Sequence, residues 1–306
     1  MDKVKPKISI GIPAFNAEKT IEKIIKSILN QTIKDFEVII SDNASEDKTL
    51  EICRKYGEND RRFRIFNQGK NMGPYWNYDF VLEKAQAEYF VWFATDDEHG
   101  KTFLEKNLEE LEKNKNSVAS ISNVEYFGKN LDRIIENSYF QNLKNKFKYK
   151  FDKKTKFNQV FSSNGTFEKR ATLYLRMDRS TAFYSLFRTS IIKKSMITTP
   201  FGGSDLAIIL NILKYGQIHV IDEILMRKNL DGYSSKGIIS YLKNQNTKLL
   251  NIIFMNMPFT IWCAKNLGFK IFMKNLDWFI IINVYGAYLL LSDIIQIISN
   301  RNNNKK

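Results

Sequence analysis

The chain has 306 residues, of which 43% are hydrophobic and 26% charged, a balance typical of globular proteins with a buried core. This composition excludes an intrinsically disordered chain, and the length allows one large domain or two ordinary ones. The 47 basic and 33 acidic residues give a net charge of +14, which favours anionic partners such as nucleotides, nucleic acid or acidic membrane surfaces.

Two features of the sequence bear on the compartment. Cys53 and Cys263 are too few and too far apart for a disulfide framework or a zinc site, so a reduced setting is expected. The first apolar run is broken by Pro13 and Asn16 and has no small-residue cleavage site, so no secretory signal is expected. We therefore expect a cytoplasmic protein.

The first 125 residues alternate short apolar runs with longer amphipathic stretches, which predicts βαβ units. We expect buried parallel strands at residues 8–12, 36–41, 63–66, 89–93 and 118–124. Apolar residues at helical spacing predict crossover helices at residues 19–30, 49–56, 77–85 and 103–113. The predicted fold class is therefore α/β, with a mostly parallel sheet flanked by helices.

The middle of the chain is less regular. Lysines alternate with aromatic residues between 144 and 156, which predicts an edge hairpin. That stretch also fits nucleic-acid binding, but it lacks the aromatic strand pattern of an RNA-recognition module, so we expect no nucleic-acid partner. Beyond it we expect a strand at 182–187, a helix at 205–214 and strands around 218 and at 224–226.

After about Gly237 the chain becomes a helical tail rich in apolar residues, densest at residues 278–292. This stretch is too short, and too interrupted by Asn283 and Gly286, to span a bilayer. Two interpretations stay open. The tail is a packed helical subdomain or dimer surface, or it lies with residues 252–262 and the basic C-terminal end on an anionic membrane.

Polar residues follow three of the predicted strands at their carboxyl ends, where open α/β sheets bind ligands. The first cluster is Pro13, Ala14, Phe15, Asn16 and Glu18, and the second runs from Ser41 to Asp47 and includes Asp42 and Asn43. Helix N-capping equally explains Asn16, Ser45 and Asp47. It explains Asp42 poorly, because this carboxylate stands several residues ahead of the helix and is placed to accept a hydrogen bond from a ligand N–H such as a uracil ring.

The third cluster is the acid pair Asp96 and Asp97. Adjacent acids after a buried strand are costly unless they are paired, solvated or bound to metal. Mg²⁺ and Mn²⁺ take oxygen ligands and are commonly held by one or two carboxylates together with substrate phosphates. The pair therefore indicates a divalent metal site, the alternative being an acidic cap for the helix that starts near Lys101.

In this order the motifs resemble the donor-binding half of glycosyltransferase family 2, over nearly all of residues 7–120; they read ISIGIPAFN, VIISDNASEDKT, GKNMGPYWN and FATDDE. The resemblance implies a GT-A fold, a nucleotide-diphosphate sugar donor, a divalent metal (Mn²⁺ or Mg²⁺) and, in most members, inversion of the anomeric centre. It also implies that the Pro13–Glu18 loop and Asp42 hold the nucleoside and that Asn71 and Gly73 help to build the nucleotide pocket.

The acid motif departs from the family pattern of Asp-x-Asp followed by another Asp. Ala94 stands in the first place, which leaves Asp96 and Asp97. By resemblance one of them contacts the metal and the other contacts the ribose or phosphate.

In the second half FGGSDLAIILNILKYG resembles the acceptor-side motif of the family, with Asp205 in the place of the catalytic base. Such a carboxylate takes the proton of the acceptor hydroxyl. A plain N-cap is the alternative for Asp205. Many members carry a metal-binding His further on, and ILMRKNLDGYSS has none. Arg227 or Lys228 then offsets phosphate charge, or the metal keeps another water.

The two histidines are not obvious ligands. We expect His219 to be a core residue of an apolar strand, and we consider a role near the donor for His99, which follows the acid pair.

The predicted organisation is a GT-A domain at 1–236, with a nucleotide-sugar half at 1–125 and an acceptor-side half at 126–236, and a helical extension at 237–306. The resemblance implies an inverting, metal-dependent transfer, by default from a UDP-sugar, to a surface glycan or lipid-linked acceptor at the cytoplasmic face of the membrane. Two alternative functions stay open: an inactive nucleotide- or glycan-binding protein of an assembly complex, and a nucleotidyltransferase. The latter normally has a Gly-rich phosphate loop after the first strand, and GIPAFNAE is not one.

Overall fold

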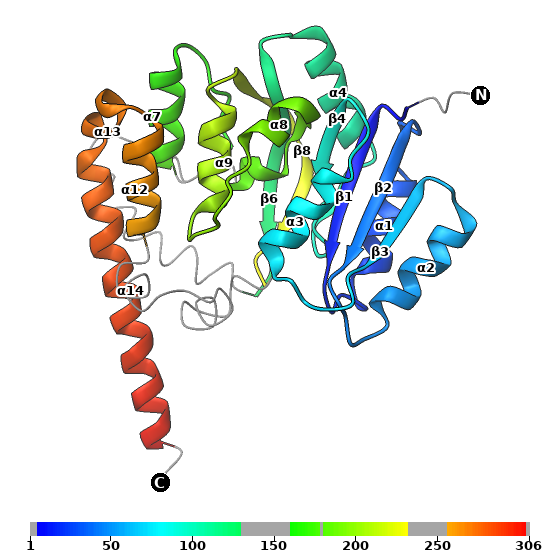
Figure 1. Ribbon diagram of the computed structural model, residues 1–306, viewed down its shortest axis with the longest axis horizontal. Helices are drawn as coiled ribbons and strands as arrows, with labels where there is room; N and C mark the ends of the chain where they lie inside the picture. The colour runs from blue at the N-terminus through cyan, green and yellow to red at the C-terminus, as the bar shows by residue number, and fades with distance from the viewer. Residues whose placement is uncertain (1–4, 130–159, 178–179, 232–255, 304–306) are drawn as a thin grey trace.

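The structure is a computed structural model that describes residues 5–129, 160–177, 180–231 and 256–303. Within those residues the centre of the molecule is an eight-stranded sheet with the order β3-β2-β1-β4-β7-β6-β8-β5 (Figure 1). The strands are β1 Ile8–Ala14, β2 Phe36–Asp42, β3 Phe63–Asn67, β4 Tyr89–Trp92, β5 Glu98–His99, β6 Ser117–Phe127, β7 Leu186–Arg188 and β8 Gln217–Asn229.

Most of the sheet is parallel, as predicted. β1 pairs in parallel with β2 and β4, and β2 pairs in parallel with β3, so their carboxyl ends meet at one edge. The last residues of β1 and β2, Ala14 and Asp42, are direct partners in this register. β7 is antiparallel to both of its neighbours, and β6 pairs in parallel with the long strand β8.

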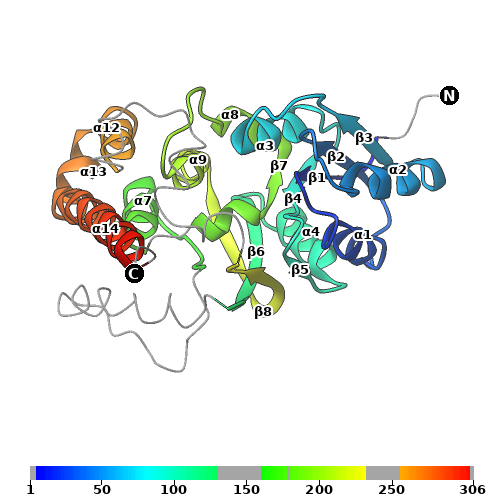
Figure 2. The ribbon, with the colours of Figure 1, turned by 90° about the horizontal axis from the view of Figure 1, so that it is seen from below.

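Helices cover both faces of the sheet, and the four crossover helices predicted in the first half are confirmed. They are α1 Ile21–Leu29, α2 Thr49–Asn59, α3 Pro74–Glu83 and α4 Phe103–Lys113. α3 lies with α8 (Thr189–Ser195) on one face of the sheet, and α1 and α4 lie on the other (Figure 2). α3 begins three residues before the predicted start, because Pro74 occupies its first turn and has the fixed φ angle that suits that position.

The helix predicted at 205–214 is confirmed as α9 Ser204–Ile212, whereas the strand predicted at 182–187 is wrong for most of its length. Residues Ser180–Tyr184 form a 3₁₀ helix, η1, and only the last two predicted residues lie in β7. The reason is a tight turn in which the backbone N–H and the hydroxyl of Ser185 both donate to the carbonyl of Ala182. Phe183 then stacks on Trp92, with ring centroids 4.2 Å apart, so its burial comes from tertiary packing.

Other elements differ from the expectation in smaller ways. The strands expected around 218 and at 224–226 form the single strand β8, which has register shifts against β6 where its middle bulges. α7 (Phe167–Met177), α8 and the two-residue strand β5 were not predicted. The stretch at 144–156 and the domain boundary at 236 lie outside the described residues.

The C-terminal part contains α12 Met257–Asn266, α13 Phe269–Lys274 and α14 Leu276–Asn303. The helix expected at 278–292 lies inside α14, which continues beyond it. α14 runs along the end of the molecule opposite α2, and its free end points in the same direction as the carboxyl ends of β1 and β2 (Figure 1). In the described part of the chain we find no helix with the length and apolar character needed to cross a membrane.

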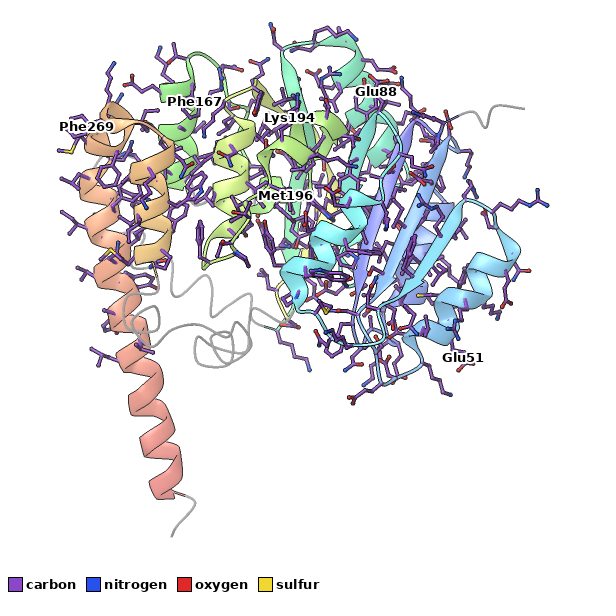
Figure 3. The ribbon with its side chains drawn as sticks, viewed as in Figure 1. Glu51, Glu88, Phe167, Lys194, Met196 and Phe269 are labelled. Atoms are coloured by element: carbon purple, nitrogen blue, oxygen red, sulfur yellow. The ribbon has the colours of Figure 1, made fainter. Side chains whose placement is uncertain are left out.

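The C-terminal helices are attached to α7 and α9 by a small apolar interface and by polar contacts at its rim. The buried apolar side chains are Phe259, Cys263, Leu267, Ile271, Trp278 and Phe279. At the rim Arg176 of α7 donates hydrogen bonds to both carboxylate oxygens of Asp277 (2.8 and 3.0 Å) and to the side-chain oxygen of Asn275. Phe269 lies at the outer end of this region, near Phe167 and far from Glu51 of α2 (Figure 3), and 79% of it is exposed.

Candidate active site

The loops after β1 and β2 are joined to each other by hydrogen bonds. The backbone N–H of Asn16 donates to the hydroxyl of Ser45, and the side-chain oxygen of Asn16 accepts from the N–H of Glu46. The N–H of Glu18 donates to Asp47, whose other carboxylate oxygen accepts from the N–H of Thr49. These bonds hold the first two predicted clusters together, with Pro13 half-buried and Phe15 exposed at 42%.

Asp42 lies beneath this pair of loops and is fully buried. One of its carboxylate oxygens accepts a hydrogen bond from the N–H of Ser45 at 3.1 Å. The other oxygen has no hydrogen-bond partner among the described residues. A buried carboxylate oxygen without a partner is energetically costly, so this position suits a ligand that brings a donor.

Asn43 connects the loop after β2 to the loop before α3. Its side-chain amide donates to the side-chain oxygen of Asn71 (3.0 Å) and to the carbonyl of Gly73 (3.2 Å), and its oxygen accepts from the N–H of Met72. Gly73 has φ +88°, a conformation that favours glycine, and it leads directly into α3. Hydrogen bonds of Asn43 thus fix the loop that carries Asn71 and Gly73 to the residue next to Asp42.

The acid pair lies between β4 and β5, and the two carboxylates have different surroundings. Asp96 is half-exposed, whereas the side chain of Asp97 is only 1% exposed. Asp97 Oδ1 accepts a hydrogen bond from the backbone N–H of Asn229 at 2.9 Å, and Oδ2 lies 3.7 Å from the ammonium of Lys228. Burial raises the pKa of Asp97 to about 6, and Lys228 acts in the opposite direction. α4 starts only at Phe103, so neither acid caps that helix.

Asp205 lies in the first turn of α9, one residue after its start, and its Oδ1 accepts from the N–H of Leu206. The N-cap of α9 is Gly203, so capping does not explain Asp205. Burial raises the pKa of Tyr184, and Asp97, Asp205 and Asp96 each raise it further through their charges. Asp205 and the acid pair therefore lie around the same tyrosine, although more than 100 residues separate them in the chain.

Three residues around this site were missed by sequence reasoning. The apolar pattern places Tyr184 in a strand and Tyr78 in a helix, and neither pattern indicates that their hydroxyl groups lie 3.5 Å apart. Asn77 donates to the carbonyls of Ala14 and Ser41, and its buried side-chain oxygen has no partner among the described residues. Of these three residues, only Asn77 could have been found from the sequence, because it is a polar residue on the face of the predicted helix that is expected to be buried.

The histidines differ from each other. The expectation that His219 is a core residue is wrong, because 38% of its side chain is exposed and Nδ1 lies 3.4 Å from a carboxylate oxygen of Glu110. His99 is buried on β5, and its ring stacks on Phe93 with a centroid separation of 3.6 Å. Burial lowers the pKa of His99 to about 3, so the ring is neutral.

The acid pair can accept a divalent cation. The described residues contain no group of three or more His, Cys, Asp or Glu side chains suited to a metal ion. However, Asp97 has a buried oxygen without a hydrogen-bond partner and Asp96 is accessible beside it. Two carboxylates are sufficient when substrate phosphates complete the shell, so the residues present fit Mg²⁺ or Mn²⁺.

The sheet is mostly parallel, and its carboxyl edge carries the buried carboxylate of Asp42, the loop bound by Asn43 and the acid pair. This arrangement is typical of α/β proteins that bind a ligand at that edge. Residues 9–192 match the family model described as glycosyl transferase family 2, so the chain belongs to that family. The resemblance read from the motifs is confirmed, and the chain is a glycosyltransferase.

Two relatives illustrate this similarity. The chain is 29% identical over 258 residues to the GalNAc(5)-diNAcBac-PP-undecaprenol beta-1,3-glucosyltransferase of Campylobacter jejuni, which covers 78% of this chain and 81% of that protein. It is 42% identical over 101 residues to the cholesterol galactosyltransferase of Borreliella burgdorferi, which covers 33% of this chain and 28% of that protein.

Solved structures share the fold at low sequence identity. Residues 1–349 of S. aureus TarS in complex with UDP-GlcNAc superpose with a TM-score of 0.56 and 16% identity, covering 85% of this chain and 73% of that one. The mannosyltransferase PcManGT of Pyrobaculum calidifontis, in complex with GDP-Man and Mn²⁺, gives a TM-score of 0.56 at 13% identity and covers 97% of this chain and 76% of that one. The predicted GT-A fold is thereby confirmed.

Proposed function

We propose that this glycosyltransferase moves a sugar from a nucleotide-diphosphate donor, by default a UDP-sugar, to a hydroxyl of a glycan or lipid-linked acceptor. The observation that carries the proposal is Asp42, a fully buried carboxylate with one oxygen bonded to Ser45 and one without a partner among the described residues. A ring N–H of the nucleobase supplies the missing donor. The UDP-GlcNAc complex of the TarS fragment, which shares the fold, supports this choice of donor.

In this proposal the loops around Asp42 make the other contacts to the nucleotide sugar. The Pro13–Glu18 loop and Asn43 line the nucleoside, and Asn71 and Gly73 close the pocket from the side of α3. Hydrogen bonds hold these loops before the donor arrives, which reduces the entropy cost of binding.

Asp205 is the base of the reaction. Its carboxylate takes the proton from the acceptor hydroxyl as that oxygen attacks the anomeric carbon opposite the departing nucleotide diphosphate, in a single displacement that inverts the centre. The acid pair Asp96 and Asp97 would hold Mg²⁺ or Mn²⁺, which stabilises the negative charge of the leaving group. The Mn²⁺ in the PcManGT complex supports a metal of this type.

The acceptor is best sought among cell-surface glycans built on lipids. The Campylobacter jejuni relative has an undecaprenol-linked glycan in its name, and it covers most of this chain. The proposed organisation is a GT-A domain at 1–236 and an extension at 237–306, working at the cytoplasmic face of the membrane.

The test is release of nucleotide diphosphate from UDP-, GDP- and dTDP-sugars with and without Mn²⁺, in the wild type and in Asp96→Asn. We expect metal-dependent hydrolysis of one donor, lost in the variant. Nucleotide binding is measured in parallel by calorimetry. Binding without any turnover after acceptors are supplied would favour an inactive assembly protein, and the absence of all nucleotide binding would contradict the proposed donor site.

We further propose that α14 rests on an anionic lipid surface. Its exposed apolar side chains recur every three or four residues and form one stripe, with exposures of 57% at Ile280, 66% at Val284, 55% at Tyr288 and 60% at Leu291. Such a stripe suits the boundary between headgroups and acyl chains, and the net charge of +14 favours anionic lipids. The lipid-linked glycan in the name of the relative supports a lipid surface over a second copy of the chain.

Sedimentation with vesicles tests this second proposal. The full chain should bind vesicles that contain phosphatidylglycerol and bind neutral vesicles less. Val284→Glu should reduce that binding, whereas Ile224→Glu, at an equally exposed apolar residue of β8 (58%), should not. A chain that ignores vesicles and elutes as a dimer that Val284→Glu dissociates would assign the stripe to a second copy instead.

A further inference from the structure

The end of β8 carries two consecutive cations that face different surroundings. Arg227 donates to Glu125 (2.6 Å) and to Glu98 (2.8 Å), so carboxylates balance its charge. Neighbouring residues of a strand point to opposite faces, and Lys228 accordingly lies on the other side, next to Asp97. Of these two residues, Lys228 is therefore the one that lies beside the acid pair.

Two contacts among the described residues hold the ammonium of Lys228. It lies 3.8 Å from the centroid of the Tyr184 ring, a cation–π contact that restrains the charge. Its distance to Asp97 Oδ2 is 3.7 Å, longer than the roughly 2.8 Å of a charge-assisted hydrogen bond. The side chain is 21% exposed, so a ligand can reach it.

The backbone keeps this lysine beside the acid pair. The N–H of Asn229, the residue after Lys228, donates to Asp97 Oδ1 at 2.9 Å. Asp97 therefore ties the end of β8 to the loop that carries Asp96. This puts one cation next to two carboxylates, at the edge where the donor is proposed to bind.

A nucleotide diphosphate brings several negative charges to a site that already holds Asp96, Asp97 and Asp205. Its binding requires fixed positive charge, and Lys is a common phosphate ligand because its ammonium is a compact point charge. Lys228 lies 3.7 Å from Asp97 Oδ2, beside the acid pair, where it can supply such a charge.

We propose that Lys228 binds the diphosphate of the donor and that Tyr184 and Asp97 position its ammonium. This inference rests on the proposed function. In the transfer step the bond between the anomeric carbon and the diphosphate oxygen breaks, its electron pair stays on that oxygen, and a bond forms to the acceptor oxygen. The acceptor proton passes to Asp205. The ammonium of Lys228 offsets the charge that develops on the leaving oxygen.

The test compares nucleoside, monophosphate and diphosphate binding by calorimetry. The wild type, Lys228→Gln, Lys228→Arg and the control Arg227→Gln are titrated with uridine, UMP and UDP, each with Mg²⁺ and with EDTA. We expect Lys228→Gln to weaken UDP binding by about 10-fold to 100-fold, the range of a charged hydrogen bond, and to leave uridine binding unchanged. Lys228→Arg should recover part of the loss, and Arg227→Gln should bind UDP as the wild type does.

Two results would overturn the assignment. Equal UDP affinity in Lys228→Gln and the wild type would remove Lys228 from the diphosphate site. A parallel loss of uridine and UDP affinity would show that Lys228 only supports the local structure. If the wild type binds none of UDP, GDP and dTDP, the proposed donor site itself fails, and the role of Lys228 falls with it.

Discussion

The donor-side edge of the sheet and the C-terminal helices are held by different forces. At the edge, side chains such as Asn16, Asn43 and Asp47 accept hydrogen bonds from backbone N–H groups of neighbouring loops, so each loop is fixed by several directional bonds. The C-terminal helices are attached by a small apolar interface with Arg176 and Glu168 at its rim, and they leave a stripe of apolar residues exposed. A donor pocket needs fixed geometry, whereas the proposed lipid contact of α14 needs exposed apolar area and a basic protein, and no fixed geometry.

The largest expected effect is on the chemistry at the edge. Asp205→Asn removes the proposed base, and kcat should fall by about 10²-fold to 10⁴-fold, the usual contribution of general base catalysis. UDP affinity should change far less than kcat, because the proposed role of Asp205 is to take the acceptor proton. Initial rates with a donor and acceptor pair test this, with Asp35→Asn at the exposed opposite edge as the control. A fully active Asp205→Asn would assign the base to another residue.

The second effect concerns the fixed geometry of the pocket. Asn43→Ala removes three hydrogen bonds to the loop at 71–73 and should lower the free energy of unfolding by about 1–3 kcal/mol. Because the loop lines the pocket, UDP binding should weaken about 10-fold. Urea unfolding and calorimetry measure the two quantities.

Glu37→Gln is the matched control for Asn43→Ala. Glu37 is buried at the far edge and accepts from Ser9, Gln86 and Arg64. Its loss should also reduce stability, by at least as much as Asn43→Ala does, with no change in UDP affinity. If both variants bind UDP equally well, the loop at 71–73 does not shape the donor pocket.

The third effect is on the attachment of the C-terminal helices. Arg176→Met removes the bonds to Asp277 and Asn275 and should cost about 1 kcal/mol, since this pair is partly exposed. Hydrogen exchange should speed up in residues 257–303 and stay unchanged in residues 8–113. Equal acceleration in both regions would mean that the two parts unfold as one unit.

The smallest effect is a pH dependence at the same rim. Hydrogen bonds from Lys270 and Lys274 lower the pKa of Glu168 to about 2 from its ordinary 4.5. A lowered carboxyl pKa stabilises the fold above pH 4.5, and this contribution is lost as the pH falls toward 2. An NMR titration of Glu168 should give the low pKa, and Glu168→Gln should remove the acid dependence of exchange in α13. A pKa near 4.5 would show that the two lysines do not hold α13.

The sequence predicted β1 to β4 and α1 to α4 because each has a strong local signal. β4 (Tyr89–Trp92) is a continuous apolar run, and α1 carries Ile21, Ile24, Ile25 and Ile28 on one face. The prediction of a strand at 182–187 was wrong because an apolar sequence can equally form a buried 3₁₀ helix, as it does here where Phe183 packs on Trp92. The prediction for His219 was wrong because an apolar stretch of sequence does not show which of its residues the tertiary structure leaves partly exposed, beside Glu110 in this case.

The candidate site also has a part that the sequence predicts and a part that only the tertiary structure shows. Its motif residues, from Pro13 to Asp97 and Asp205, were named from short stretches of sequence. By itself the sequence determined the family, the order of the strands along the chain and the residue types at the carboxyl edge, because these depend on local patterns. Only the tertiary structure decided which of those residues meet: β8 lies between β6 and β5, which brings Lys228 and Asn229 to Asp97, and η1 places Tyr184 among the acids. Such contacts join residues far apart in the chain, and they form only when the sheet is complete.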